Sequence, residues 1–162
     1  MRKVALITDG WRRLFTYAWP AGILQRIRET GEDVNLYIFN STGNWSRDAG
    51  YNRAEYNIYN LPELSDFDGI ILELNNISSP AVLADVISNA KRSGRPVVSI
   101  ANELGDFYYV GIDNYSAMKQ VIAHLHEVHD CKKFWLLVGA QDNYESSCRL
   151  QGMLDYAKEH KI

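Results

Sequence analysis

Short apolar runs alternate with helix-like stretches along most of the chain, and this alternation limits the folds that it can adopt. Apolar runs of about four to eight residues bounded by turn residues are typical of strands buried on both faces of a sheet. Parallel neighbours need crossover connections, which helices usually provide. The pattern therefore predicts an α/β fold, a parallel sheet flanked by helices. The runs that predict strands are 3–8, 34–40, 69–74, 96–102, 108–113 and 134–139.

Helix signals separate these runs. Ser79 is a typical cap, and Pro80 suits the first helical position, where no intrahelical N–H partner is lost. Pro20 is expected in the first turn of its helix for the same reason. Gly94 is expected to end the helix that Ser79 begins. The predicted helices are 18–30, 53–61, 78–94, 115–128 and 146–160.

Composition excludes several classes of protein. Of the 162 residues, 46% are hydrophobic and 23% charged, which is the globular range. A net charge of −3 argues against a general nucleic-acid binder, which needs a basic face. The longest apolar run near the N-terminus, 4–8, is shorter than the roughly 7–15 residues of a signal peptide, and no run reaches the roughly 18–20 of a membrane span. A cytoplasmic protein with no membrane association is expected.

The segments that follow the strands are the places to look for a ligand, because ligands of parallel α/β sheets lie beyond the carboxyl ends of the strands. Aromatic residues, Phe15 and Tyr17 among them, follow the first strand. Their faces suit sugar rings or bases, although such residues also seal the end of a sheet. These segments are 9–17, 73–78, 101–107, 113–116 and 140–149.

Amide and charged side chains gather in the later segments. Amides both donate and accept hydrogen bonds, which suits hydroxyl-rich ligands, but Asn is also common in turns that enter helices. Arg149 could donate a bidentate pair of hydrogen bonds to ligand hydroxyls or to a carboxylate. The alternative is that it is a solvent-exposed arginine on a helix. Asp113 and Asn114 either bind ligand or cap the following helix. The other polar residues considered in these segments are Glu73, Asn75, Asn76, Asn102, Glu103, Gln141, Asp142, Asn143 and Arg149.

Motifs for several chemistries are absent from the sequence. There is no GxxxxGK[ST], no GxGxxG after the first strand and no GxSxG. His124 and His126 point about 200° apart on a helix, so they cannot share a metal without distortion. We therefore expect no metal, no cofactor and no enzymatic activity.

The order of these segments resembles the ligand-binding region of LacI-type regulators, which are similar to type 1 periplasmic sugar-binding proteins. The resemblance covers 3–162 and rests on the following segments in order: FDGIIL, RPVVSI, VGIDN, KKFWLLVG and S-x-x-R-x-x-G. It implies an N-terminal lobe at 1–113, a crossing helix at 114–130 and the first strand–helix unit of an incomplete second lobe at 131–162. The stretch 55–72 also resembles sensor regions that precede diguanylate cyclase or kinase outputs.

The resemblance implies contacts with a ligand in a cleft between the lobes. It selects Phe15 and Tyr17 in the aromatic segment, and Arg149 in the S-x-x-R-x-x-G segment. It also selects Glu73 and Asn75 after the third strand and Asn143 in the last loop, while Asn102 is added from its place after the fourth strand. The first strand starts near the N-terminus with no helix-turn-helix ahead of it, so we expect no operator binding by that route.

The sequence thus predicts the ligand-sensing domain of a LacI-like bacterial regulator, which binds a small polar molecule such as a sugar and signals to an output domain. Residues 134–139 would leave an apolar surface and open strand edges, so a homodimer is expected. Two alternatives stay open. One is a flavodoxin-like enzyme using Asp9 or Glu103, for which no nucleophile–base pair is visible; the other is a dimerisation module without a ligand.

Overall fold

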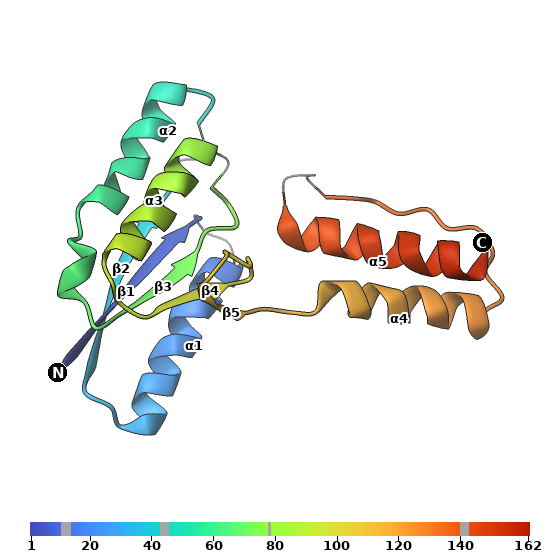
Figure 1. Ribbon diagram of the computed structural model, residues 1–162, viewed down its shortest axis with the longest axis horizontal. Coiled ribbons are helices and arrows are strands. Elements are labelled where there is room, and N and C mark those ends of the chain that lie inside the picture. The colour runs from blue at the N-terminus through green and yellow to red at the C-terminus, as the bar shows by residue number, and fades with distance from the viewer. Residues whose placement is uncertain (11–13, 43–45, 78, 140–142) are drawn as a thin grey trace. The chain divides into compact units, whose positions relative to one another are not determined.

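The chain forms two units, and each is a separate body. The computed structural model describes residues 1–10, 14–42, 46–77, 79–139 and 143–162, without the side chains of 14–16. The N-terminal unit, Met1–Val110, holds a sheet with helices; the C-terminal unit, Gly111–Ile162, holds a pair of helices (Figure 1). Among the described residues, no helix is both long and apolar enough to cross a lipid bilayer.

The sheet of the N-terminal unit has five parallel strands in the order β2-β1-β3-β4-β5. Leu6 in β1 lies beside Ile38 of β2 on one side and Ile71 of β3 on the other. The predicted parallel α/β fold is therefore confirmed. The strands are β1 (Arg2–Asp9), β2 (Val34–Ser41), β3 (Gly69–Glu73), β4 (Val97–Ile100) and β5 (Tyr108–Val110).

Helices cover both faces of this sheet. Crossover connections are right-handed, and β2 and β3 lie on opposite sides of β1. Consequently α1 covers one face while α2 and α3 lie over the other (Figure 1). These elements are α1 (Leu14–Thr30), α2 (Ala49–Glu55), α3 (Pro80–Arg92) and two 3₁₀ helices, η1 (Tyr56–Asn60) and η2 (Leu64–Asp66).

The hydrophobic core lies between β1, β3 and the layer formed by η1 and α3. Leu72 is completely buried, and Tyr59 and Val86 are each 3% exposed. Burial of these apolar side chains supplies the main driving force for folding of this unit. The central members are Ala5, Ile7, Tyr56, Tyr59, Leu64, Ile70, Leu72, Val86 and Ala90.

The predicted start of α3 is confirmed, but two other helices differ from the prediction. The Ser79 side chain accepts a hydrogen bond from the Val82 amide, and Pro80 is the first helical residue. By contrast, α1 begins at Leu14 rather than 18, so Pro20 lies inside the helix and removes one of its hydrogen bonds. The helix expected at 53–61 starts earlier as α2, because Asp48 caps it, and continues as η1.

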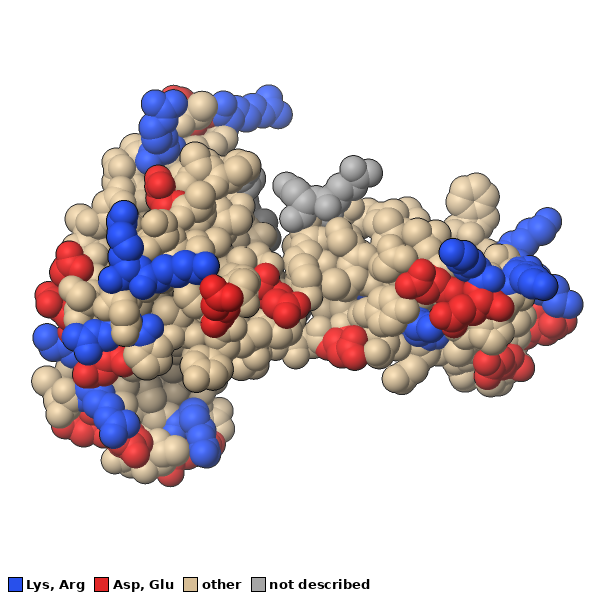
Figure 2. Space-filling view, in the orientation of Figure 1, with Lys and Arg blue, Asp and Glu red and all other residues tan. Residues whose placement is uncertain are grey.

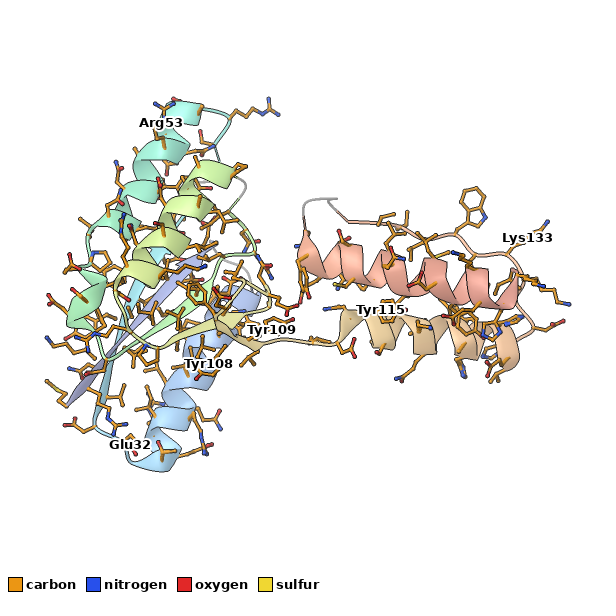
Figure 3. The ribbon with its side chains drawn as sticks, viewed as in Figure 1. Glu32, Arg53, Tyr108, Tyr109, Tyr115 and Lys133 are labelled. Atoms are coloured by element: carbon orange, nitrogen blue, oxygen red, sulfur yellow. The ribbon has the colours of Figure 1, made fainter. Side chains whose placement is uncertain are left out.

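The C-terminal unit consists of α4 (Asn114–Glu127), a returning segment and α5 (Tyr144–His160). Because the segment returns, the two helices run in the same direction (Figure 1). The Tyr115 hydroxyl donates to Asp155 Oδ2 at 3.0 Å, and Lys119 pairs with Glu159 at 2.9 Å. Figure 3 shows Tyr115 on α4. The closest approach is at Gly152, where a Cβ would lie 2.4 Å from the Tyr115 carbonyl oxygen.

The strand expected at 134–139 is absent from the structure. Burial alternates along this segment, since Phe134 and Leu136 are half-buried while Trp135 and Leu137 are fully exposed. This is the alternation of a strand, but a strand also needs a hydrogen-bonded neighbour. In the part of the chain that the structure describes, the one sheet consists of β1 to β5 and none of them pairs with this segment. The assignment of 131–162 to an incomplete second lobe stays a prediction.

Candidate functional site

Polar side chains meet where β1, β2 and β3 end, and we call this place the carboxyl edge of the sheet. Thr8 in β1 lies beside Glu73, the last residue of β3. Asp9, the last residue of β1, lies beside Ser41, the last residue of β2. All four are buried, and Asp9 is only 1% exposed. Parallel register therefore brings two carboxylates and two hydroxyls to one edge.

Hydrogen bonds connect the carboxyl edge to the surrounding loops. The Thr8 hydroxyl donates to Glu73 Oε2 at 2.8 Å, and the Tyr59 hydroxyl donates to the Thr8 carbonyl oxygen at 2.9 Å. The side chain of Asn76 donates to the Asp9 carbonyl oxygen at 2.8 Å. Such bonds are strong in a buried setting and fix the side chains that they join. The carboxyl edge is thus a rigid polar network rather than a set of solvated side chains.

Tyr59 stays neutral in this network. Burial raises its pKa well above the ordinary value, and the nearby Asp9 carboxylate raises it further, while a hydrogen bond with Ser41 acts in the opposite direction. A neutral phenol keeps its proton for the bond to Thr8.

We expect the Tyr59→Phe variant to lose about 0.5–1.5 kcal/mol of unfolding free energy at neutral pH, because one buried hydrogen bond is removed. The folded-state pKa of Tyr59 is raised, so its contribution is present below the ordinary tyrosine pKa near 10 and is lost as the pH rises above it. The variant should therefore lose less stability than the parent between neutral pH and a pH above 10.

Urea denaturation at the two pH values measures this difference. Tyr51→Phe is the matched control, because Tyr51 is 47% exposed and its replacement should leave stability at neutral pH within about 0.5 kcal/mol. Equal pH dependence in the parent and in Tyr59→Phe would contradict the assignment.

The exit of β4 adds a strained turn to the carboxyl edge. Ala101 has a φ of +63°, a left-handed conformation that is uncommon for a residue with a Cβ. Its amide donates to the Val110 carbonyl oxygen at 2.9 Å, and the Ser99 hydroxyl donates to the Asn102 carbonyl oxygen at 2.5 Å. Backbone strain of this kind clusters at functional sites. The turn holds Asn102 half-buried just beyond the strand.

The structure brings three of the predicted ligand-binding residues to one edge of the N-terminal unit. Glu73 ends β3 and is 5% exposed, and Asn75 and Asn102 follow β3 and β4 as half-buried residues. Tyr17 lies in the first turn of α1 and is 63% exposed. The side chain of Phe15 lies outside the described residues. Contact of any of these residues with a ligand stays a prediction.

Asn143 and Arg149, the other two predicted residues, belong to the C-terminal unit and have partners there. Asn143 caps α5, its side chain accepting from the Ser146 amide at 2.9 Å. Arg149 Nη1 donates to Asn114 Oδ1 at 2.6 Å. Asp113 caps α4 by accepting from the Ser116 amide at 2.9 Å, so the capping interpretation of Asp113 is confirmed.

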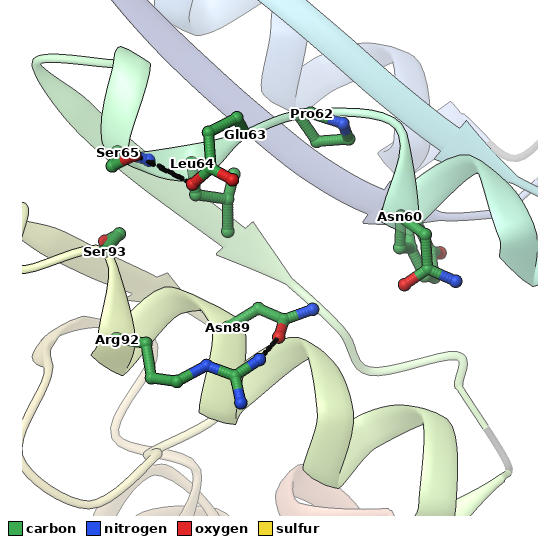
Figure 4. Close-up of a pocket in the computed structure, with 9 residues that line it drawn as sticks. Asn60, Pro62, Glu63, Leu64, Ser65, Asn89, Arg92 and Ser93 are labelled. Carbon is green, nitrogen blue, oxygen red and sulfur yellow. Dashed lines mark hydrogen bonds between the residues drawn. The ribbon is translucent and has the colours of Figure 1, made fainter.

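Two pockets lie at the opposite edge of the sheet, near the amino ends of its strands. The first has a volume of about 300 Å³ and is shown in Figure 4. Its polar side chains are partly paired with one another: Ser65 Oγ donates to Glu63 Oε1 at 2.8 Å, and Arg92 donates to Asn89. The second, of about 260 Å³, is lined by Ala90, Lys91, Arg95, Pro96, Val97, Asp106, Phe107 and Tyr108. Because ligands of parallel α/β sheets bind beyond the carboxyl ends of the strands, both pockets are weaker candidate sites than the carboxyl edge.

The surface charge is mixed on the face of the molecule that Figure 2 shows. Figure 2 shows basic and acidic residues interspersed on the face in view. The exposed edge strand β5 carries Tyr108 and Tyr109, which are labelled in Figure 3. That face is therefore not the single-signed basic surface by which proteins neutralise nucleic-acid phosphates.

Sequence reasoning missed Thr8 and Tyr59 as members of the polar network. For Thr8, the polar Thr-Asp pair at the end of an otherwise apolar strand could have indicated a place in a polar network at the strand exit. Tyr59 had none, because its contact with Thr8 spans 51 positions and depends on the 3₁₀ turn that follows α2.

Comparisons with known proteins identify the fold. No model of a protein family matches the chain, and neither does any curated protein. Solved structures do match. The chain superposes on a periplasmic binding protein/LacI transcriptional regulator from Alkaliphilus metalliredigens, complexed with D-xylulofuranose, with a TM-score of 0.67 and 19% identity over 100% of this chain and 54% of that one.

Two further solved structures agree with this match. The transcription regulator CcpA of Lactococcus lactis gives a TM-score of 0.69 with 21% identity over 100% of this chain and 55% of that one. A periplasmic solute-binding protein from Actinobacillus succinogenes with bound D-allose gives 0.69 with 17% identity over 98% of this chain and 56% of that one. The chain has the type 1 periplasmic-binding-protein fold. It spans about half the length of these matched structures. The type 1 periplasmic-binding-protein fold predicted from the sequence is therefore confirmed.

Proposed function

We propose that this chain is a ligand-sensing domain that binds a small polar molecule, most simply a sugar, at the carboxyl edge of its sheet. The observation that carries the proposal is the convergence there of buried Asp9 and Glu73 with half-buried Asn75 and Asn102. Ligands of open α/β sheets bind beyond the carboxyl ends of the strands. Carboxylates accept hydrogen bonds and amides both donate and accept them, which is the chemistry that recognises hydroxyl groups.

Structures with the same fold support a sugar as the ligand. Two of the matched proteins were solved with D-xylulofuranose and D-allose. We propose that this chain takes a ligand of the same hydroxyl-rich class. Tyr17, which is 63% exposed in the first turn of α1, is available to contact one face of a sugar ring.

Thermal shift measurements with pentoses, hexoses, nucleosides and amino acids test the proposal. A ligand that binds only the folded chain at a hundredfold excess over its Kd stabilises it by about 2.7 kcal/mol. For a chain of this size that raises the Tm by about 5 °C or more. The Asn102→Ala variant should lose most of the shift, because it removes a half-buried amide at the strand exit.

Arg28→Ala is the matched control for this experiment. Arg28 is exposed in the last turn of α1, which leads to the amino end of β2 and so lies away from the strand exits. It should keep the full shift. The proposal is contradicted if no compound of the panel raises the Tm of the parent chain. It is also contradicted if Asn102→Ala and Asn75→Ala both keep the full ligand-induced rise in Tm, because the ligand would then bind elsewhere than at the carboxyl edge.

Arg149 and Asn143 require a separate test, because they lie in the C-terminal unit. Arg149 already bonds Asn114, so Arg149→Ala should destabilise the packing of α4 and α5 whatever the ligand does. If Arg149 also binds the ligand, the rise in Tm that the ligand produces should be smaller in Arg149→Ala than in the parent chain. The reduction should exceed the fall in Tm of the ligand-free variant.

The proposal extends to a role in regulation. Ligand binding would shift a conformational equilibrium and bias an output domain, as in a LacI-like cytoplasmic regulator. It assigns the chain no reaction of its own.

We further propose that the chain forms a homodimer through the segment 134–139. Trp135 and Leu137 are fully exposed, and the segment has the alternation of a strand edge, which readily pairs with another chain. Antiparallel pairing about Leu136 would place Trp135 opposite Leu137 of the second copy, a favourable cross-strand pair.

Sedimentation velocity over a range of concentrations tests the dimer. The parent chain should sediment increasingly as a dimer, whereas Leu137→Lys should remain a monomer, because two lysines would be brought into an apolar interface. Leu61→Lys is the control, since Leu61 is 75% exposed but lies in the N-terminal unit. A parent chain that stays monomeric at high concentration contradicts the homodimer.

A further inference from the structure

The four histidines of the chain all lie in the C-terminal unit, and the structure divides them into two groups. His126 and His160 pack against Tyr156 on α5. His126 Nδ1 lies 3.2 Å from the Tyr156 hydroxyl, and the His160 ring stacks on the Tyr156 ring at 4.1 Å between centroids. These two histidines therefore pack at the contact between α4 and α5.

The other two histidines face each other at the end of α4. The Nε2 atoms of His124 and His129 share a hydrogen bond at 3.1 Å, and the two rings meet edge to face at 4.9 Å between centroids. Both side chains are exposed. Helical geometry keeps His126 on a different side of α4 from His124. His129 lies beyond the end of α4, and the chain folds back there so that His129 lies beside the last helical turn.

A fixed turn produces this juxtaposition. The Val128 amide donates to the His124 carbonyl oxygen at 3.0 Å, and the Cys131 amide donates to the Leu125 carbonyl oxygen at 3.1 Å. Asp130 takes a left-handed conformation with a φ of +51°, which reverses the chain. The backbone therefore holds His129 near His124 before any ligand arrives, and such preorganisation lowers the entropic cost of binding.

We propose that His124 and His129 bind one divalent transition-metal ion of the zinc, copper or nickel class through their Nε2 atoms. Two nitrogens 3.1 Å apart, each about 2.0–2.1 Å from one metal, subtend an angle of roughly 95–100° there, which is within the range of distorted tetrahedral and tetragonal sites. Imidazole nitrogen is a preferred ligand of these ions.

Water completes the coordination of this site. Among the residues that the structure describes, no group of three or more His, Cys, Asp or Glu side chains is arranged to hold a metal ion. The two histidines are exposed, so solvent reaches the remaining positions. An open site of this kind can exchange its ion, and the ion would tie the last turn of α4 to the start of the segment that follows.

Isothermal titration of the untagged chain with ZnCl₂ and with CuCl₂ tests the proposal. We expect one metal ion per chain, with copper bound more tightly than zinc. His124→Gln and His129→Gln should each weaken binding by at least about tenfold, because each removes one of two protein ligands. His160→Gln is the matched control and should keep the parent affinity, because His160 stacks on Tyr156 instead.

Two further controls make the result decisive. Circular dichroism of each variant checks that α4 and α5 remain folded, and Cys131→Ser tests the nearby thiol as the true ligand. The proposal is overturned if the parent chain binds neither ion. It is also overturned if both glutamine variants bind within about twofold of the parent, or if Cys131→Ser abolishes binding while they do not. The test is independent of sugar binding, since it uses the metal salts alone.

Discussion

The Leu72→Ala variant should lose about 2–5 kcal/mol of unfolding free energy in the N-terminal unit. Leu72 is completely buried in β3, which is hydrogen-bonded to a strand on each side, and it belongs to the core between the sheet, η1 and α3. Truncation removes apolar contacts and leaves a cavity that a strand fixed by neighbours on both sides cannot collapse to fill. Urea denaturation of the parent and the variant measures the difference.

Leu61→Ala is the matched control for Leu72→Ala. Leu61 is 75% exposed, so the same change in side chain should alter stability by no more than about 0.5 kcal/mol. A loss of less than about 1 kcal/mol in Leu72→Ala would show that β3 is not packed as described.

The Gly152→Ala variant should destabilise the packing of α4 against α5 by about 1–3 kcal/mol. A Cβ at this position would lie 2.4 Å from the Tyr115 carbonyl oxygen, which is backbone and cannot move aside without separating the helices. Alanine is otherwise the better helix former, so the expected sign is opposite to its propensity. Amide hydrogen exchange in α4 and α5 should accelerate by about 5- to 150-fold.

Gly22→Ala provides the contrasting substitution. Gly22 lies inside α1, and a Cβ there meets no atom within 4 Å. The change should therefore stabilise the chain by about 0.5–1 kcal/mol. If Gly152→Ala also stabilised the chain, the two helices would not cross at Gly152.

The sequence predicted those elements whose signals are local. Ser79 and Pro80 begin α3 as expected, because a cap and a first-turn proline act within a few residues. The five strands were recognised from their apolar runs, and parallel order followed from the intervening helices. Pro20 misled the prediction of α1, because a proline suited to the first turn also occurs inside this longer helix.

The strand expected at 134–139 shows why a short apolar run alone is insufficient. In the structure, exposed Trp135 and Leu137 alternate with half-buried Phe134 and Leu136, as side chains do along a strand. A strand is defined by pairing, and pairing depends on residues far away in the sequence. No local pattern carries that information.

The candidate site was predictable only in part. Parallel topology fixed the edge at which Glu73 and Asn102 would lie, since strand exits share one side of the sheet. The contact of Tyr59 with Thr8 and the pairing of His124 with His129 depend on the 3₁₀ turn and on the left-handed turn at Asp130, which the residue pattern did not reveal.

NMR titration of the ¹⁵N-labelled chain with pentoses and hexoses shows directly whether a sugar binds at the carboxyl edge. We expect the chemical-shift changes to concentrate on the amides of residues 8–10, 73–77 and 101–103, which form the strand exits. Changes confined to residues 60–65 and 89–93, which line the pocket shown in Figure 4, or no change with any sugar, would contradict binding at the carboxyl edge.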